Sequence, residues 1–239
     1  MTSDRAMLAR ALPFAAYILF LAFNQPLSQL FDWLHLDVKW LYVLRIATVA
    51  VLLIYFWREY AELKRKPMLS DFLYAGIAGF MVLIIWIFPY PNWLGGGDTQ
   101  GFNPLTGDTD LSAIFWMSVR ISGAALLVPI MEELFWRSFV MRWFDKADFL
   151  KVLPENISSY AYVGSACLFA LEHHLWLAGL FAGLVYGELY KTYKNLWIPV
   201  FAHAVTNGLL GLYVVTTGHW QYWWQINHSR QHQPRHRVL

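Results

Sequence analysis

The stretch Val128-Pro-Ile-Met-Glu-Glu-Leu-Phe-Trp-Arg-Ser-Phe-Val-Met-Arg-Trp143 places three ionisable side chains within six residues of an apolar run. Glu132 and Glu133 are adjacent, and Arg137 follows Glu133 by four residues. On insertion scales, the free-energy cost of placing one charged side chain at the bilayer centre is roughly 2.5–3.5 kcal/mol. Three such groups so close together therefore indicate either compensating contacts or a functional site.

The composition is typical of a membrane protein. The chain has 239 residues, of which 58% are hydrophobic and 14% are charged, whereas a soluble domain is about 45–50% apolar and about 25% charged. We therefore expect an all-α fold, a polytopic transmembrane helix bundle of about seven to eight spans, with 1–239 as one membrane domain in the lipid bilayer. The net charge of +2 is too small to indicate nucleic acid as a partner, and we expect none. The single cysteine, Cys167, excludes disulfide frameworks and zinc sites built from several thiolates.

The apolar runs suggest where the helices lie. They are Met7–Phe23, Trp40–Trp57, Phe72–Phe88, Leu111–Trp143, Tyr160–Leu171, Leu175–Tyr190 and Leu196–Val215. A span needs roughly 20 residues. Leu111–Trp143 is too long for one straight span, so we expect a kink at Pro129 or two pieces. Tyr160–Leu171 is short, so it either spans with its flanking residues or lines a cavity enclosed by protein.

The connections between the runs predict an orientation. Basic residues follow the second, fourth and sixth runs, at Arg58, Lys64, Arg65, Lys66, Arg142, Lys146, Lys151, Lys191 and Lys194. The connection 89–110 contains aspartates and no Lys or Arg. The positive-inside rule then places the N-terminus in the cytoplasm. Seven spans would leave the basic tail outside, so an eighth re-entrant or spanning piece near Gln221–Ile226 stays open. We expect the polar tail 227–239 to be disordered.

The first polar group permits two interpretations. Glu133 and Arg137 share a helix face in the favourable order, acid before base. On its own, this pair fits a buried salt bridge that fixes helix packing. Glu132 lies about 100° round the helix and has no such partner. Burial makes an unpaired carboxylate a stronger base, as general-base catalysis near neutral pH requires.

Two later segments carry polar groups in similar apolar surroundings. Phe169 and His173 are four residues apart, so the phenyl ring can wall the imidazole, and His174 points elsewhere. His203 and Asn207 also share a face. Taken separately, a histidine near a membrane helix end fits an interface residue equally well. Likewise, a His-x-x-x-Asn pair fits hydrogen bonding between helices.

Together these groups suit hydrolysis of an amide. Glu132 and His173 would hold and deprotonate a water, and His203 and Asn207 would donate hydrogen bonds to the oxyanion. Zinc ligation by Glu132, His173 and His203 is one alternative, because two histidines and a carboxylate leave an open position. The other is a glutamate mechanism without metal. The sequence does not choose between them, and it has neither His-Glu-x-x-His nor a nucleophile elbow.

The three segments resemble the motifs of the CAAX prenyl protease and bacteriocin-processing family (CPBP, also called Abi) of intramembrane proteases. That family is marked by Glu-Glu-x-x-x-Arg, Phe-x-x-x-His and His-x-x-x-Asn on successive membrane helices. The matching residues, in the same order, are Glu132 to Arg137, Phe169 to His173 and His203 to Asn207. The resemblance covers about 128–211, within a catalytic core expected at 111–215.

The resemblance implies an intramembrane endopeptidase that acts on a membrane-associated protein or peptide. It makes Glu132, together with His173, the water-activating base. It makes His203 and Asn207 the oxyanion site. Glu133, Arg137 and Phe169 would then be supporting residues. It also implies a multi-pass protein of the bacterial inner membrane. Glu-His-His at 172–174 and Trp-Gln-Tyr-Trp at 220–223 are similar to a CAAX prenyl protease-related subgroup found beside exosortase sorting systems. Glu172 and His174 exceed the minimal motif, which leaves open which imidazole works.

Two other classes of function compete with an enzyme. A non-proteolytic immunity or protein-sorting accessory protein could keep the same fold, although intact copies of all three motifs favour the enzyme. A transporter or proton relay predicts polar groups in two equivalent repeats, and the sequence has no such repeat. The enzyme hypothesis requires Glu132, His173, His203 and Asn207 to converge on one cavity. The sequence specifies no substrate, cleavage site or oligomeric state.

Overall fold

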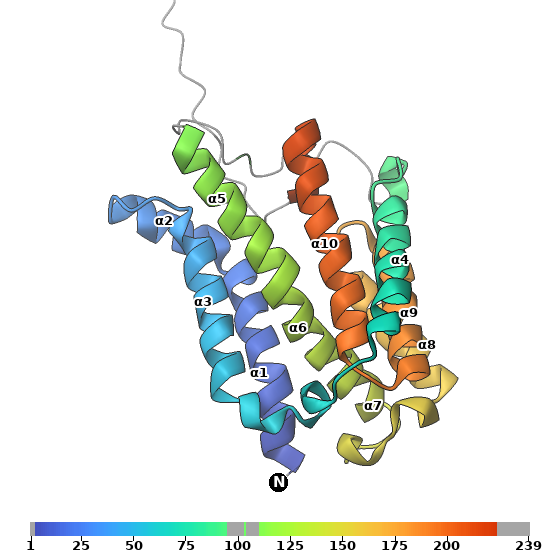
Figure 1. Cartoon of the computed structure of the whole chain (residues 1–239). Coiled ribbons are helices and arrows are strands. Elements are labelled where there is room, and N and C mark those ends of the chain that lie inside the picture. Colours follow the sequence, from blue (N-terminus) through green and yellow to red (C-terminus); the bar gives the residue numbers. More distant parts are fainter. Residues whose placement is uncertain (1–2, 95–102, 104–109, 224–239) are drawn as a thin grey trace, which may run out of the picture.

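The computed structural model describes residues 3–94, 103 and 110–223, and this part of the chain is helical without β-strands (Figure 1). The α-helices are α1 (Ser3–Ala22), α2 (Asn24–Trp33), α3 (Trp40–Tyr55), α4 (Leu69–Trp86), α5 (Asp110–Ser122), α6 (Val128–Glu133), α7 (Met141–Trp143), α8 (Ser159–Leu171), α9 (Trp176–Tyr193) and α10 (Trp197–Thr217). The predicted all-α class is confirmed. The tail 227–239 lies outside the described residues.

Four helical stretches are long and apolar enough to cross a membrane: Asp4–Ala22, Leu69–Trp86, Leu111–Trp143 and Trp197–Thr217. Two further apolar helices, Trp40–Tyr55 and Ser159–Leu171, are shorter. Each of the seven predicted apolar runs coincides with helix. The fold is therefore a helical membrane bundle, and the total of seven to eight spans stays a prediction.

Helix α2 was not expected from the sequence. The helix is interrupted at Phe23 after α1, and a new helix begins at Asn24. Pro26 falls in the first turn of α2, where its missing N–H has no helical partner to lose. The break therefore turns the chain aside before α3 begins. Near the possible eighth piece, Gln221–Ile226, the structure describes a short 3-10 helix at Trp220–Trp223, and residues 224–226 lie outside the described part. The eighth piece stays a prediction.

The long run is one continuous helix, Leu111–Trp143, rather than two pieces. It contains two π-helical segments, Gly123–Leu127 and Leu134–Val140, on either side of α6. Single π turns inside α-helices are frequent at functional sites because they change which side chains face inward. Glu132 and Glu133 are the last two residues of α6, directly before the second π segment.

The basic connections gather at the end of the bundle where α1 begins, at the foot of Figure 1. Arg5 pairs with Glu59 at 2.7 Å, and Lys194 pairs with Glu155 at 3.3 Å. Arg65 Nη1 also donates to the Lys194 carbonyl oxygen at 3.1 Å. The connections after α3, α7 and α9 therefore lie together, as the positive-inside interpretation requires. Their cytoplasmic placement stays a prediction.

A buried charge network at this end holds the second π segment. Arg10 of α1 is fully buried, and its Nη2 lies 2.7 Å from Glu62 Oε2. Arg10 Nε also donates to Ser138 Oγ at 2.9 Å, and the Ser138 hydroxyl contacts Glu62 as well. The sequence analysis did not single out these residues. The network fixes the helix that carries Glu132 against α1 and the connection after α3.

Helix α10 packs very closely against α4. A Cβ at Gly79 would lie only 2.3 Å from the Ala202 carbonyl oxygen, so only glycine allows this approach. Close contact through small residues is a general feature of membrane helix packing. Thr206 strengthens the contact, because its hydroxyl donates to the Gly79 carbonyl oxygen at 2.8 Å. The position of α10 fixes where His203 and Asn207 meet the rest of the bundle.

Candidate active site

A cavity of about 240 Å³ lies inside the bundle, between the long helix and α10. Its wall includes Glu132, His173, His203 and Asn207, the four residues to which the sequence assigns catalytic roles. They come from α6, the connection after α8, and α10. The requirement that these four side chains converge on one cavity is therefore met. Helix α8 ends where it lines the cavity with Phe169, which fits the second of the two expectations for this short run.

Glu133 forms the centre of a buried charge cluster below the cavity. Its Oε2 lies 3.1 Å from Arg137 Nε, and its Oε1 accepts a hydrogen bond from His203 Nδ1 at 3.0 Å. Glu133 is fully buried, Arg137 is 2% exposed and His203 is 5% exposed. The structure thus contains the predicted Glu133–Arg137 pair and adds a link to His203. Glu133 does more than fix packing, because it also orients an imidazole in the cavity wall.

Glu132 differs from its neighbour in its partners. Its Oε2 is buried and has no hydrogen-bond partner among the described residues. The nearest imidazole atom in an ion-pair geometry is His203 Nε2, 3.9 Å away. This distance is too long for a direct hydrogen bond but allows a water between the two groups. Glu132 therefore has a free carboxylate oxygen at the cavity, as the general-base hypothesis requires.

His173 is oriented by the helix that precedes it. Its Nδ1–H donates to the Phe169 carbonyl oxygen at 2.8 Å, which leaves Nε2 as an acceptor. The Phe169 ring packs against the imidazole at 4.6 Å, as the spacing predicted, and Trp86 meets it edge-on at 5.2 Å. His174 is exposed and does not belong to the cavity wall. The structure therefore gives His173 the place that the sequence left open between the two histidines.

His203 is held on two sides. Glu133 fixes Nδ1, and the ring of Tyr186 from α9 stacks on the imidazole with centroids 4.9 Å apart. The Tyr186 hydroxyl in turn donates to Thr206 Oγ1 at 2.7 Å. These contacts leave Nε2 directed toward Glu132. The sequence analysis did not identify Tyr186, because an aromatic residue in an apolar helix has no signal that separates a site wall from core packing.

Asn207 satisfies a carbonyl that the π-helical segment leaves without its helical donor. Val128 N–H donates to Gly123 O, one residue before its α-helical acceptor Ala124. The next residue, Pro129, has no N–H to offer. Asn207 Nδ2 fills the gap by donating to the Ala124 carbonyl oxygen at 2.9 Å. One of the two amide hydrogens of Asn207 thus makes a structural hydrogen bond, which leaves the second for the oxyanion role.

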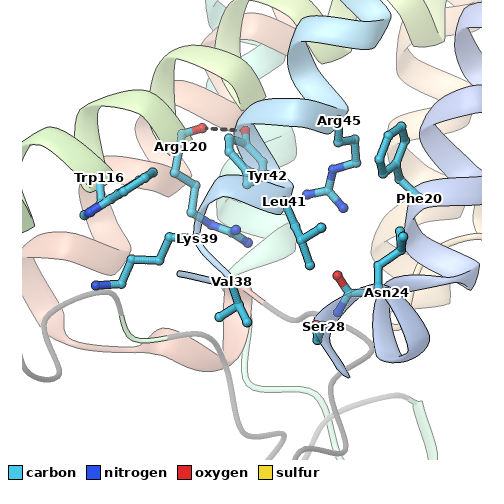
Figure 2. A pocket seen from close by; sticks show the side chains of 11 residues that line it. Phe20, Asn24, Ser28, Val38, Lys39, Leu41, Tyr42, Arg45, Trp116 and Arg120 are labelled. Carbon is cyan, nitrogen blue, oxygen red and sulfur yellow. Dashed lines mark hydrogen bonds between the residues drawn. The ribbon is translucent and has the colours of Figure 1, made fainter. Parts of the chain in front are cut away.

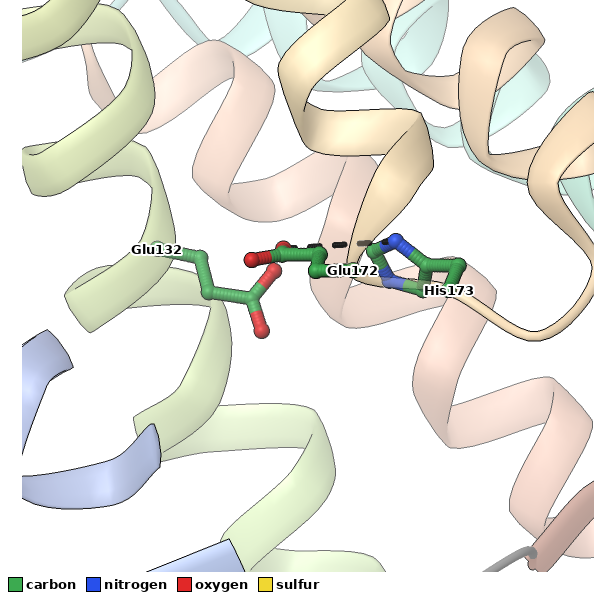
Figure 3. Close-up of side chains that lie close together, drawn as sticks. All are labelled: Glu132, Glu172 and His173. Atoms are coloured by element: carbon green, nitrogen blue, oxygen red, sulfur yellow. Dashed lines mark ion pairs between the residues drawn. The ribbon is translucent and has the colours of Figure 1, made fainter. Parts of the chain in front are cut away.

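Glu172 joins the site more closely than the sequence predicted. Figure 3 shows the carboxylates of Glu132 and Glu172 pointing toward each other, with His173 beside them. One ligand atom from each of these three residues lies within 4.8 Å of the others. Glu172 Oε1 also accepts a hydrogen bond from Trp136 Nε1 at 3.1 Å. Within the described residues, the three-ligand set therefore contains Glu172, whereas the sequence analysis had assigned that place to His203.

The ligand atoms of Glu132, Glu172 and His173 are chemically suited to bind a divalent cation. Two carboxylates and one imidazole are ligands that zinc and other first-row divalent ions accept. The buried Oε2 of Glu132 has no hydrogen-bond partner in the described part of the chain and supplies an acceptor for such an ion. The same atoms also suit a water, since hydrogen bonds of about 2.8 Å from one oxygen reach groups this far apart.

Comparison with known proteins identifies the central part of the chain. The search of curated proteins and the search of solved structures found no match to the chain. Residues 114–209 match the family model described as type II CAAX prenyl endopeptidase Rce1-like. The matched range contains Glu132, Arg137, His173, His203 and Asn207 and supports a protease role at a membrane. Residues 114–209 of this chain are therefore similar to the Rce1-like type II CAAX prenyl endopeptidase domain.

Proposed function

We propose that the protein is an intramembrane endopeptidase that hydrolyses a peptide bond of a membrane-associated protein or peptide. The observation that supports this most directly is the unpartnered, buried Oε2 of Glu132 in a cavity that also presents two oriented histidines. Keeping a carboxylate oxygen buried without a hydrogen bond costs stability. Such an arrangement is expected where the oxygen receives a proton during a reaction.

The attacking water is held between Glu132 and His173. His173 Nε2 accepts one water hydrogen bond, and Glu132 takes the other proton as the water oxygen attacks the peptide carbonyl carbon. The C–N bond then breaks as Glu132 returns this proton to the leaving nitrogen. The products are a carboxylic acid and an amine, so atoms and charges balance without another reactant.

The developing oxyanion is stabilised from α10. Glu133 accepts the Nδ1–H of His203. The oxyanion role also requires a proton on His203 Nε2, since only an imidazolium donates from both ring nitrogens. The second amide hydrogen of Asn207 supplies another donor. Removing one such donor from an oxyanion site typically costs about 2.7–4 kcal/mol of transition-state stabilisation. Arg137 acts through Glu133, because it holds that carboxylate from the opposite side.

A divalent cation would be held by Glu132, Glu172 and His173. When bound, it would polarise the peptide carbonyl and make the water more acidic. The close approach of two carboxylates favours this proposal, since they repel each other unless a proton or a cation lies between them. Glu172 is in either case positioned by Trp136.

The adjacent histidines provide a matched pair for testing the site. We expect His173→Ala to abolish cleavage and His174→Ala to retain it, because only His173 lines the cavity. Cells that express each variant or the native chain would carry a library of membrane-anchored peptides, and mass spectrometry would map the new peptide ends. Peptide ends that appear equally with native chain and His173→Ala would contradict the proposed site. Equal protein levels are required for each comparison.

The cation proposal predicts a stability effect that does not depend on activity. We expect added Zn²⁺ or Mn²⁺ to raise the unfolding temperature of the native chain, because an ion that binds only the folded state stabilises it. Glu172→Gln removes one ligand and should abolish this shift. Glu188→Gln, an exposed position on α9, serves as the control. A shift that persists in Glu172→Gln would contradict this ligand set.

The substrate side remains part of the proposal. The family domain and the apolar helices suit a membrane-associated peptide or protein. Placement in a bacterial inner membrane and a link to an exosortase sorting system are predictions from the sequence resemblance. The peptide library above tests the proposed substrate class directly, because the sequence around a mapped cleavage site identifies the substrate.

A further inference from the structure

A second polar region lies in the same cavity, at the opposite end from Glu132. Arg45 of α3 and Arg120 of α5 both line the cavity. Figure 2 shows them on either side of Tyr42, around an adjoining hollow of about 30 Å³. Within the described residues, no Asp or Glu lines this hollow, whereas Lys39 adds a third cation to its wall. The proposed hydrolysis does not use these groups.

Arg45 is a buried cation. It is 5% exposed, and its Nε has no hydrogen-bond partner in the described part of the chain. The rings of Tyr17 and Tyr42 lie near its guanidinium, with centroids at 4.8 and 5.0 Å. Such stacking compensates part of the burial cost, but the five N–H donors of an arginine still require acceptors. An acceptor from outside the chain is therefore expected.

One face of the long helix connects this region to the catalytic residues. Arg120, Ala124, Val128 and Glu132 follow one another at four-residue intervals, and all four line the cavity. A rise of 1.5 Å per residue places Arg120 about 18 Å from Glu132 along the helix. An extended peptide covers roughly 3.3–3.6 Å per residue, so about five residues bridge the two regions. One bound peptide can therefore reach both.

We propose that Arg45, together with Arg120, forms a subsite for a carboxylate of the peptide substrate, located within about five residues of the cleaved bond. The planar guanidinium of Arg45 matches a carboxylate through two parallel hydrogen bonds. Either an acidic side chain or the carboxylate at the end of a chain supplies this group. The subsite depends on the proposed peptidase function for its ligand, but its test measures binding and needs no cleavage.

The test uses the full chain carrying Glu132→Gln, which binds without hydrolysing, in phosphatidylcholine nanodiscs. Calorimetry would compare an acetylated alanine–leucine pentapeptide as free acid, the same peptide as C-terminal amide, and that amide with one internal aspartate. We expect at least one carboxylate peptide to bind about tenfold or more tightly than the plain amide, since hydrogen bonds to charged groups are strong. The tighter of the two carboxylate peptides identifies the source of the group.

The added substitution Arg45→Gln should remove this preference, and Arg45→Lys should restore part of it. Arg58→Gln, which removes an exposed positive charge at the basic end of the bundle, should leave it unchanged. Equal binding of acid and amide peptides, or a preference that survives Arg45→Gln, would overturn the proposal. Displacement of the acid peptide by inorganic phosphate or phosphatidylglycerol at similar concentration would also overturn it, in favour of a phosphate site.

The unfolding temperature distinguishes a substrate-binding role of Arg45 from a structural role. Arg45→Met keeps an unbranched side chain and removes a buried charge whose Nε has no hydrogen-bond partner among the described residues. We expect its unfolding temperature to be equal to or higher than that of the native chain, because removing an uncompensated buried charge does not destabilise a fold. A clear decrease would show that Arg45 supports the fold itself and would overturn the subsite.

Discussion

Replacing Glu132 by Gln is expected to lower the rate of peptide cleavage by about 10⁴-fold, the upper end of what a general base contributes. The amide keeps the size of the carboxylate but cannot accept the proton of the attacking water. Because Glu132 Oε2 has no hydrogen-bond partner in the described structure, the substitution breaks no such bond at that atom. The unfolding temperature should therefore change little. The rate would be measured on a peptide identified in cells, with enzyme and peptide in the same vesicles.

Glu188→Gln is the matched control for this substitution, since it changes the same chemical group at an exposed position on α9. It should cleave at the native rate. Equal rates for the native chain and Glu132→Gln would remove the catalytic role of Glu132 and favour the non-proteolytic accessory protein. A loss of activity accompanied by a large fall in unfolding temperature would assign Glu132 a structural role instead.

Replacing Glu133 by Ala is expected to destabilise the protein by about 3–5 kcal/mol, the usual result of removing one partner from a buried ion pair. Glu133 is fully buried and contacts both Arg137 and His203. Its loss leaves the Arg137 guanidinium without its carboxylate in a site that is 2% exposed. Unfolding in mixed micelles with increasing denaturing detergent would measure the change. Asp148→Ala, which removes a surface pair with Lys151, should produce no measurable change.

The double substitution Glu133→Leu with Arg137→Met separates the two roles of this cluster. Removing both charges avoids an unpaired buried ion, so much of the stability should return. Cleavage should stay low, because His203 loses the acceptor that orients its Nδ1–H. Recovery of both stability and cleavage would show that Glu133 serves helix packing alone, which is the other interpretation that the sequence allowed.

The residues of the catalytic cavity were predictable because helical spacing and chemical type carry the information. Glu133 and Arg137 pair as their four-residue separation predicted. Phe169 walls His173, and four polar groups from separate segments line one cavity. Apolar runs likewise predicted most of the helices, since a membrane span must satisfy its backbone hydrogen bonds within itself. The helices and the two four-residue pairs depend on residue spacing within one segment, whereas the shared cavity was predicted from the chemical types of the residues.

The features that the sequence missed depend on contacts between segments far apart in the chain. Helix α2 was not predicted, because a short helix beside a break has no apolar run to mark it. The first π-helical segment ends beside Pro129, whose missing N–H leaves the Ala124 carbonyl oxygen to Asn207 of another helix. Glu172 enters the ligand set only because α8 ends beside α6.

The amino-acid order alone predicts an all-α membrane bundle with catalytic-type groups in apolar surroundings. Composition and periodicity predict those properties through the cost of exposing polar backbone and charge to lipid. The three-dimensional fold adds that Glu133 links Arg137 to His203, that Glu132 Oε2 has no hydrogen-bond partner among the described residues, and that Arg45 lies at the other end of the same cavity. A buried polar atom is paired or unpaired according to which neighbours the fold brings within about 3 Å, and sequence spacing does not specify those neighbours.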